Sequence, residues 1–76
     1  MTRVKAELVV KNLLKERGLT QKELSKLTGM REATVSRLAR GFVDRVELEQ
    51  ISKIANALNI TDISEILKLV EDKEGV

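Results

Sequence analysis

The side chains of this sequence that could carry covalent chemistry lack the partners that such chemistry needs. The 76 residues include neither cysteine nor histidine. This composition excludes thiolate or imidazole metal sites, a disulfide framework and a histidine-based nucleophilic triad. Four serines therefore have no imidazole base, and three carboxylates show no pairing signal. They are Ser25, Ser36, Ser52 and Ser64, and Glu47, Glu49 and Glu65. We predict a protein that is not an enzyme and that uses no metal and no cofactor.

The length and composition favour a small binding domain. A chain of 76 residues buries roughly 60% of its unfolded surface, which leaves little room for an enclosed substrate cavity. The hydrophobic residues are almost all aliphatic, with Phe42 as the one aromatic candidate for the core. No repeat or linker divides the sequence, so we expect one domain over residues 1–76, with a polar tail from about residue 71. No apolar run approaches the roughly 18 residues of a membrane span, so we expect a soluble, cytoplasmic protein.

The positive and negative charges are unevenly distributed along the chain. Residues 1–45 carry eleven Lys and Arg and five acids, a net charge of +6. Residues 46–76 carry three basic residues and seven acids, a net charge of −4. A basic front half and an acidic rear half would orient the molecule in the field of a polyanion, although many solvated helical surfaces show a similar asymmetry.

The stretch from Leu19 to Gly41 predicts two short helices joined by a tight turn, and we expect the rest of the chain to support this pair. Thr20 and Glu23 have the spacing of a capping box, so the first helix should start at Gln21. Its apolar stripe contains Leu24 and Leu27, and Ser25 is small enough to let a neighbouring helix approach. Gly29 should end this helix because glycine tolerates the left-handed conformation of a helix C-terminus.

The second helix of the pair has one apolar and one polar side. Val35 and Leu38, three residues apart, should point inward, and Gly41 follows the helix. The outer side carries small and long polar residues together with basic ones. They are Arg31, Glu32, Ala33, Ser36, Arg37 and Arg40.

The residues before the pair predict a supporting helix from Arg3 to Arg17, which Gly18 ends. Apolar residues recur there at helical spacing. They are Ala6, Val9, Val10, Leu13 and Leu14. A short strand in residues 3–10 is the alternative that the valines suggest, but the helical period of the following residues outweighs it. We expect Lys11, Lys15 and Arg17 to be solvated charges.

Two further helices are expected after Gly41. The fourth, with Asp44 as a candidate cap, should end at Asn59, and its predicted buried side comprises Leu48, Ile51, Ile54, Ala55 and Leu58. Thr61 or Asp62 should open a fifth helix. Its apolar residues are Ile63, Ile66, Leu67 and Val70. The expected fold is an all-α, compact five-helix bundle without a strand.

A polar helix flanked by basic residues has the width and the chemistry to enter the major groove of duplex DNA. The exposed front of the second helix supplies the candidates for base contacts, which are Arg31, Glu32, Ala33, Ser36 and Arg37. Candidates for contacts to the DNA backbone include the N-terminus of the Gln21 helix. The backbone set is Gln21, Lys22, Thr34, Arg40 and Arg45. Two alternatives stay open: Glu32 could instead orient Arg31 or Gln21, and Arg40 could complement the helix dipole.

The combined pattern resembles the Xre-type family of phage-repressor and Cro-like helix-turn-helix proteins. The resemblance rests on Thr20-Gln21-x-x-Leu24-Ser25, then Gly29, then Thr34 to Leu38 and Gly41. It implies a lambda-repressor-like bundle whose third helix enters the major groove, with the base and backbone contacts given above. Arg31 departs from the pattern because it stands where many members have a capping Ser or Thr, and Ala39 replaces a common Glu.

The resemblance leads to a specific functional hypothesis. We predict a sequence-specific double-stranded DNA-binding transcriptional regulator, a repressor that binds its operator as a homodimer. Ile66, Leu67 and Val70 offer a dimer surface, unless this face closes the core instead. The alternative is an adaptor, antitoxin or antirepressor that acts through a protein partner.

Overall fold

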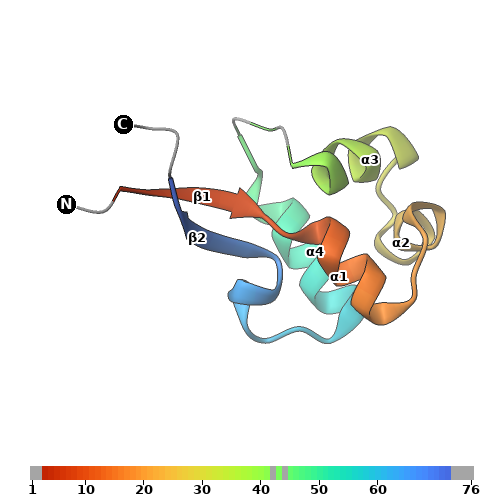
Figure 1. Cartoon of the computed structure of the whole chain (residues 1–76). Helices are drawn as coiled ribbons and strands as arrows, with labels where there is room; N and C mark the ends of the chain where they lie inside the picture. Colours follow the sequence, from red (N-terminus) through yellow and green to blue (C-terminus); the bar gives the residue numbers. More distant parts are fainter. Residues whose placement is uncertain (1–2, 42, 44, 73–76) are drawn as a thin grey trace.

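The computed structural model describes residues 3–41, 43 and 45–72, and it combines four helices with a two-stranded sheet (Figure 1). The free end of the sheet and helix α2 lie at opposite ends of the molecule. In chain order the elements are β1 (Val4–Leu8), α1 (Val10–Arg17), α2 (Gln21–Thr28), α3 (Glu32–Arg40), α4 (Leu48–Leu58), the short 3₁₀ helix η1 (Ile63–Glu65) and β2 (Leu67–Glu71).

The core is aliphatic, as the composition predicts, and all four helices contribute to it. Leu24, Val35 and Ile66 have essentially no exposed surface. The buried hydrophobic residues are Leu8, Val10, Leu13, Leu14, Leu24, Met30, Val35, Leu38, Ala39, Ile54, Leu58, Ile60 and Ile66. The predicted aromatic core residue Phe42 lies outside the described residues, as does the predicted cap Asp44.

The expected helix from Arg3 to Arg17 is wrong in its first half, where the chain forms strand β1. Within β1, apolar Val4, Ala6 and Leu8 alternate with Lys5 and Glu7, which is the two-residue period of a strand. The same apolar residues also fit a helical period when they are joined to the residues of α1. These residues form a strand because they pair with β2, which lies about sixty residues away in the sequence.

The expected fifth helix is also wrong. Asp62 does cap the chain as predicted, since its carboxylate accepts a hydrogen bond from the Ser64 backbone N–H at 2.9 Å, but η1 ends after three residues. The following residues form β2, which pairs antiparallel with β1. The fold is therefore mostly helical with a small sheet, rather than an all-α five-helix bundle.

Helix α4 follows the prediction at its end and departs from it at its start. Asn59 ends the helix with a positive φ of 55°, as expected. Ile54 and Leu58 are buried, but Leu48 is 81% exposed because it is the first residue of the helix, beyond the edge of the core.

The helices of the described residues are all too short or too polar to span a membrane.

Candidate nucleic-acid interface

Helix α2 begins as the sequence predicts, at a complete capping box. The Glu23 backbone N–H donates to the Thr20 hydroxyl, and the Thr20 backbone N–H donates to the Glu23 carboxylate, each at 3.0 Å. The backbone N–H groups of Gln21 and Lys22 precede the first intrahelical bond, so they are oriented out of the helix end. Both side chains are exposed. This end of α2 can therefore offer N–H donors and a partial positive charge to a phosphate.

The turn between α2 and α3 is fixed by side-chain hydrogen bonds that sequence reasoning missed. The Ser25 hydroxyl donates to the Met30 carbonyl oxygen at 2.5 Å, and the Thr28 hydroxyl donates to the Leu24 carbonyl oxygen at 2.7 Å. The Met30 N–H donates back to the Thr28 hydroxyl at 3.2 Å. Gly29 ends α2 in the left-handed backbone conformation, with a φ of 75°. Ser25 therefore does more than leave space for a neighbouring helix, because its hydroxyl joins α2 to the residues that lead into α3.

Helix α3 is anchored by one buried side. Val35 and Leu38 are buried as predicted, and so is Ala39. Helices α2 and α3 pack against each other, and α1 packs against α3. Packing on this side fixes which residues of α3 face solvent.

The opposite side of α3 carries most of the predicted base-contacting residues. Arg31, Glu32, Ala33 and Arg37 are exposed, whereas Ser36 is half-buried. Ala33 and Arg37 are four residues apart, so they occupy the same face of the helix. Arg31 is the N-cap residue, and its side chain makes no capping hydrogen bond. The departure of Arg31 from the family pattern therefore leaves the first turn of α3 without a side-chain cap.

The predicted backbone-contacting residues lie on three different segments. Gln21 and Lys22 lie at the start of α2, Thr34 and Arg40 lie on α3, and Arg45 lies between α3 and α4. Thr34 is half-buried and the other four are exposed. Within the described part of the chain, neither ion pair involves any of these residues or the base-contacting set, so the suggested pairing of Glu32 with Arg31 is not observed.

Arg17 differs from the expected solvated charge. Its guanidinium donates to the Leu58 carbonyl oxygen at 3.0 Å and lies 3.4 Å from the Glu65 carboxylate. These bonds join the end of α1 to the end of α4 and to η1. Arg17 therefore has a structural role in holding the supporting elements together.

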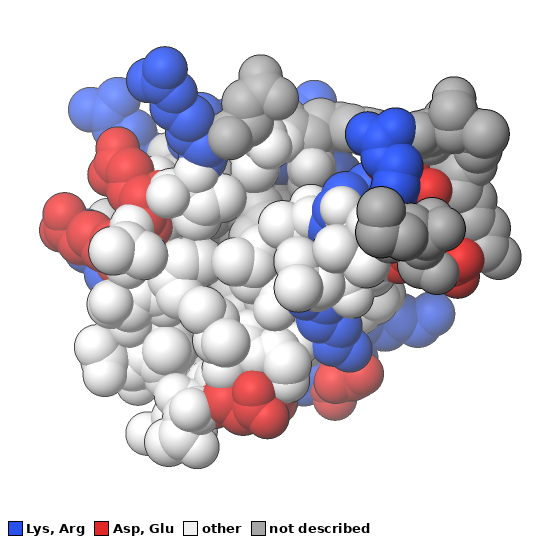
Figure 2. All heavy atoms as spheres, turned by 90° about the vertical axis from the view of Figure 1, so that its left-hand side faces the viewer, with Lys and Arg blue, Asp and Glu red and all other residues white. Residues whose placement is uncertain are grey.

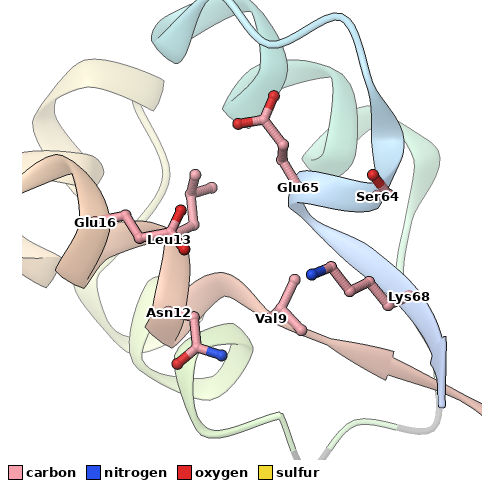
Figure 3. A pocket seen from close by; sticks show the side chains of 7 residues that line it. All are labelled: Val9, Asn12, Leu13, Glu16, Ser64, Glu65 and Lys68. Atoms are coloured by element: carbon pink, nitrogen blue, oxygen red, sulfur yellow. The ribbon is translucent and has the colours of Figure 1, made fainter.

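A hollow lies between α1 and the η1–β2 segment (Figure 3), and no residue of α3 lines it. Polar residues of both segments line it, including Asn12, Glu16, Glu65 and Lys68. Among the described residues, no group of three or more Asp and Glu side chains is placed to hold a metal ion. The hollow adds no further residue to the candidate interface.

The comparison with protein families agrees with this geometry. Residues 9–72 match the model of the Cro/C1-type HTH DNA-binding domain. The chain belongs to this family. The match confirms the resemblance noted in the sequence, and it spans the elements from α1 to β2 but leaves out β1. No curated protein and no solved structure matches the chain significantly.

For this Cro/C1-type domain, the dimer surface suggested by the sequence needs revision. Ile66 is completely buried, so its side chain closes the core and is not available to a second molecule. Leu67 and Val70 are half-buried. Ile63, which the sequence assigned to the same apolar side, is 56% exposed. The apolar residues of this segment are divided between core and surface because η1 ends at Glu65 and a strand follows, so no continuous helix places them on one side.

Proposed function

We propose that this protein is a sequence-specific transcriptional regulator, acting as a repressor, that inserts α3 into the major groove of its operator. The observation that carries the proposal is the exposed side of α3, where Arg37 follows Ala33 by one turn on a helix whose other side is buried. An α-helix fits the width of the major groove, and an arginine can donate two hydrogen bonds to guanine. The family assignment supports DNA binding itself.

The exposed side chains of α3 are proposed to read the bases. Arg31 and Arg37 would donate to guanine, Glu32 would accept from cytosine, and the Ala33 methyl group would contact a thymine methyl group. Ser36 is half-buried, so its hydroxyl would reach a base only at the closest approach of the helix.

Contacts to the DNA backbone are proposed to set the register of α3. The N–H groups at the start of α2 would hold one phosphate, next to the side chains of Gln21 and Lys22. Thr34, Arg40 and Arg45 would hold phosphates on either side of the groove. These contacts carry no sequence information, but they fix which base each residue of α3 meets.

The regulator is proposed to bind as a homodimer. One domain of this size contacts few base pairs, and two domains on half-sites about one helical turn apart would double the contacts. The operator would then have two-fold or approximate two-fold symmetry.

Selection of sites from random duplex DNA by the purified protein tests the proposal. The expected result is an enriched motif with two half-sites, recovered by the wild-type protein and lost in Arg37→Ala. The matched control is Lys15→Ala, which removes an exposed cation from α1 and should recover the same motif. Failure of the wild-type protein to enrich any motif would contradict the proposal and indicate that the fold acts through a protein partner.

A further inference from the structure

The two strands form a ribbon with one mostly apolar face and one mostly charged face. In the antiparallel register, Ala6 lies opposite Leu69, and Glu7 lies opposite Lys68. Because opposite residues share a face, the apolar side chains gather on one side. This face consists of Val4, Ala6 and Leu8 of β1 and Leu67 and Leu69 of β2, with Glu71 at its end.

The apolar face is covered at one end of the ribbon and uncovered at the other. Leu8 is buried against the helices, whereas Val4 is 60% and Leu69 is 72% exposed. The ribbon extends beyond the helices, so its far end has no helix packed on it (Figure 1). Viewed from this end, a broad area without charged side chains crosses the middle of the surface, with cations and acids around it (Figure 2). An isolated two-stranded ribbon is marginally stable in water, which makes a covering partner favourable.

The backbone of β1 also has an unpaired edge among the described residues. The Val9 N–H donates to the Ile66 carbonyl oxygen, and the Asp72 N–H donates to the Arg3 carbonyl oxygen. Odd-numbered residues therefore bond to β2, and the even-numbered residues direct their N–H and C=O groups to the other edge. The described sheet has no third strand on that edge. The edge runs from Val4 to Leu8, where Gly41 approaches the Leu8 carbonyl oxygen.

We propose that the occupant of this edge is a second copy of the chain, whose β1 pairs antiparallel with the first about Ala6. The three interior residues of β1 can each serve as the centre. Pairing centred on Lys5 places two lysines opposite each other, and pairing centred on Glu7 places two glutamates opposite each other. Pairing centred on Ala6 places Lys5 of each copy opposite Glu7 of the other. Charge complementarity therefore selects Ala6 as the two-fold centre.

The same register also places an apolar residue of the second copy next to the exposed apolar residue Val4. Val4 of each copy comes opposite Leu8 of the other, so the free end of each ribbon meets the covered end of its neighbour. The two ribbons join into a four-stranded sheet, and the unpaired edge of β1 is removed. A two-fold contact of this kind is closed, so the assembly stops at the dimer.

This inference gives a structural basis to the proposed homodimer, and its test uses no DNA. A monomeric protein in this test would not change the result of the selection of operator sites. Conversely, a protein that selects no DNA site could still be measured as a dimer. The family match starts at residue 9, so the pairing edge is a feature of this chain outside the matched region.

The first test uses two matched proline variants and sedimentation equilibrium. Proline at an edge removes one N–H and blocks that edge, while the bonds to the neighbouring strand stay intact. Ala6→Pro blocks the edge of β1 that faces away from β2, and Leu69→Pro does the same for β2. Wild type and Leu69→Pro should be dimers, and Ala6→Pro should have half their mass. A monomeric wild type, a dimeric Ala6→Pro or an equal loss in Leu69→Pro would overturn the inference.

The second test reverses the paired charges and does not depend on proline being tolerated. Lys5→Glu should weaken self-association about tenfold or more because two attractive pairs become repulsive. The partner variant is Glu7→Lys with Lys68→Glu, which keeps opposite charges across β1 and β2 within each chain. Each variant alone should be mostly monomeric, and a mixture of the two should form a heterodimer. The control Lys15→Glu should remain dimeric. Absence of the heterodimer, or self-association of either variant equal to wild type, would overturn the proposed register.

Discussion

The Ser25 hydroxyl donates to the Met30 carbonyl oxygen at 2.5 Å across the turn that separates α2 from α3. Ser25 lies within α2, whereas Met30 follows Gly29 and belongs to the core, where it is 8% exposed. One hydroxyl thereby couples the end of the first helix to the residue that leads into the second. This bond helps to fix the turn between α2 and α3.

Substitution of Ser25 by alanine should lower the free energy of unfolding by about 1–3 kcal/mol, because the Met30 carbonyl loses its partner in a half-buried site. Urea denaturation measures the change. The matched control is Ser52→Ala, at an exposed position of α4, which should stay within about 0.5 kcal/mol of wild type. Equal effects of the two substitutions would contradict the role assigned to Ser25.

Replacement of Arg17 by methionine should also destabilise the fold, by about 1 kcal/mol, because the hydrogen bond to the Leu58 carbonyl oxygen is lost. The exposed pair with Glu65 should contribute little to this change. Glu65→Gln, which removes the charge of the partner alone, is therefore expected to leave stability nearly unchanged in the same urea experiment. A larger loss in Glu65→Gln than in Arg17→Met would show that the ion pair dominates.

The helix pair could be predicted from the sequence because its signals are local. Thr20 and Glu23 lie within one turn, and each satisfies a backbone N–H of the other. Gly29 has a positive φ, as predicted, and Gly41 has one as well. The hydrogen bonds of Ser25 and Thr28 were missed because the same residue types also occur as plain surface positions on helices. Which bases and phosphates the candidate residues contact stays a prediction.

The sheet could not be predicted because neither strand has a local signal strong enough to identify it. Val4 to Leu8 alternate over five residues only, and the apolar residues that follow extend a helical spacing through the same stretch. Leu67 to Glu71 contains adjacent apolar residues, Leu69 and Val70, which fit a helix as readily as a strand. The pairing of β1 with β2 decides between these readings, and that contact joins the two ends of the described chain.

The carboxyl group of Asp62 is expected to titrate below the ordinary range of an aspartate. The Ser64 backbone N–H bonded to Asp62 holds the pKa of this carboxyl down, with smaller contributions from the Ser64 hydroxyl and from Lys68. A lowered folded-state pKa stabilises the fold above the unfolded-state pKa, and this stabilisation is lost as the pH falls through the folded-state pKa. An NMR titration of the Asp62 side chain measures the pKa directly.

The variant Asp62→Asn provides the control for this titration, since its amide oxygen can accept the same hydrogen bond without a charge. Wild type should be the more stable protein at neutral pH, and the difference in urea midpoint should shrink as the pH falls through the pKa of Asp62. An Asp62 pKa at or above the ordinary value, or a difference that grows on acidification, would contradict the assigned cause.

Substitution of Arg37 by alanine should weaken binding to the selected operator by about 1–3 kcal/mol and relax the preference at one base pair of each half-site. Arg37 is exposed on α3 and takes part in neither ion pair of the described residues, so the fold should be unaffected. Affinity for operator and for unrelated duplex should be measured over a range of salt concentrations. A base-reading arginine affects mainly the operator, whereas a phosphate-contacting lysine such as Lys22 should affect both duplexes and reduce the salt slope by about 1. Equal losses on both duplexes for Arg37→Ala would move this residue from the base-contacting to the backbone-contacting set.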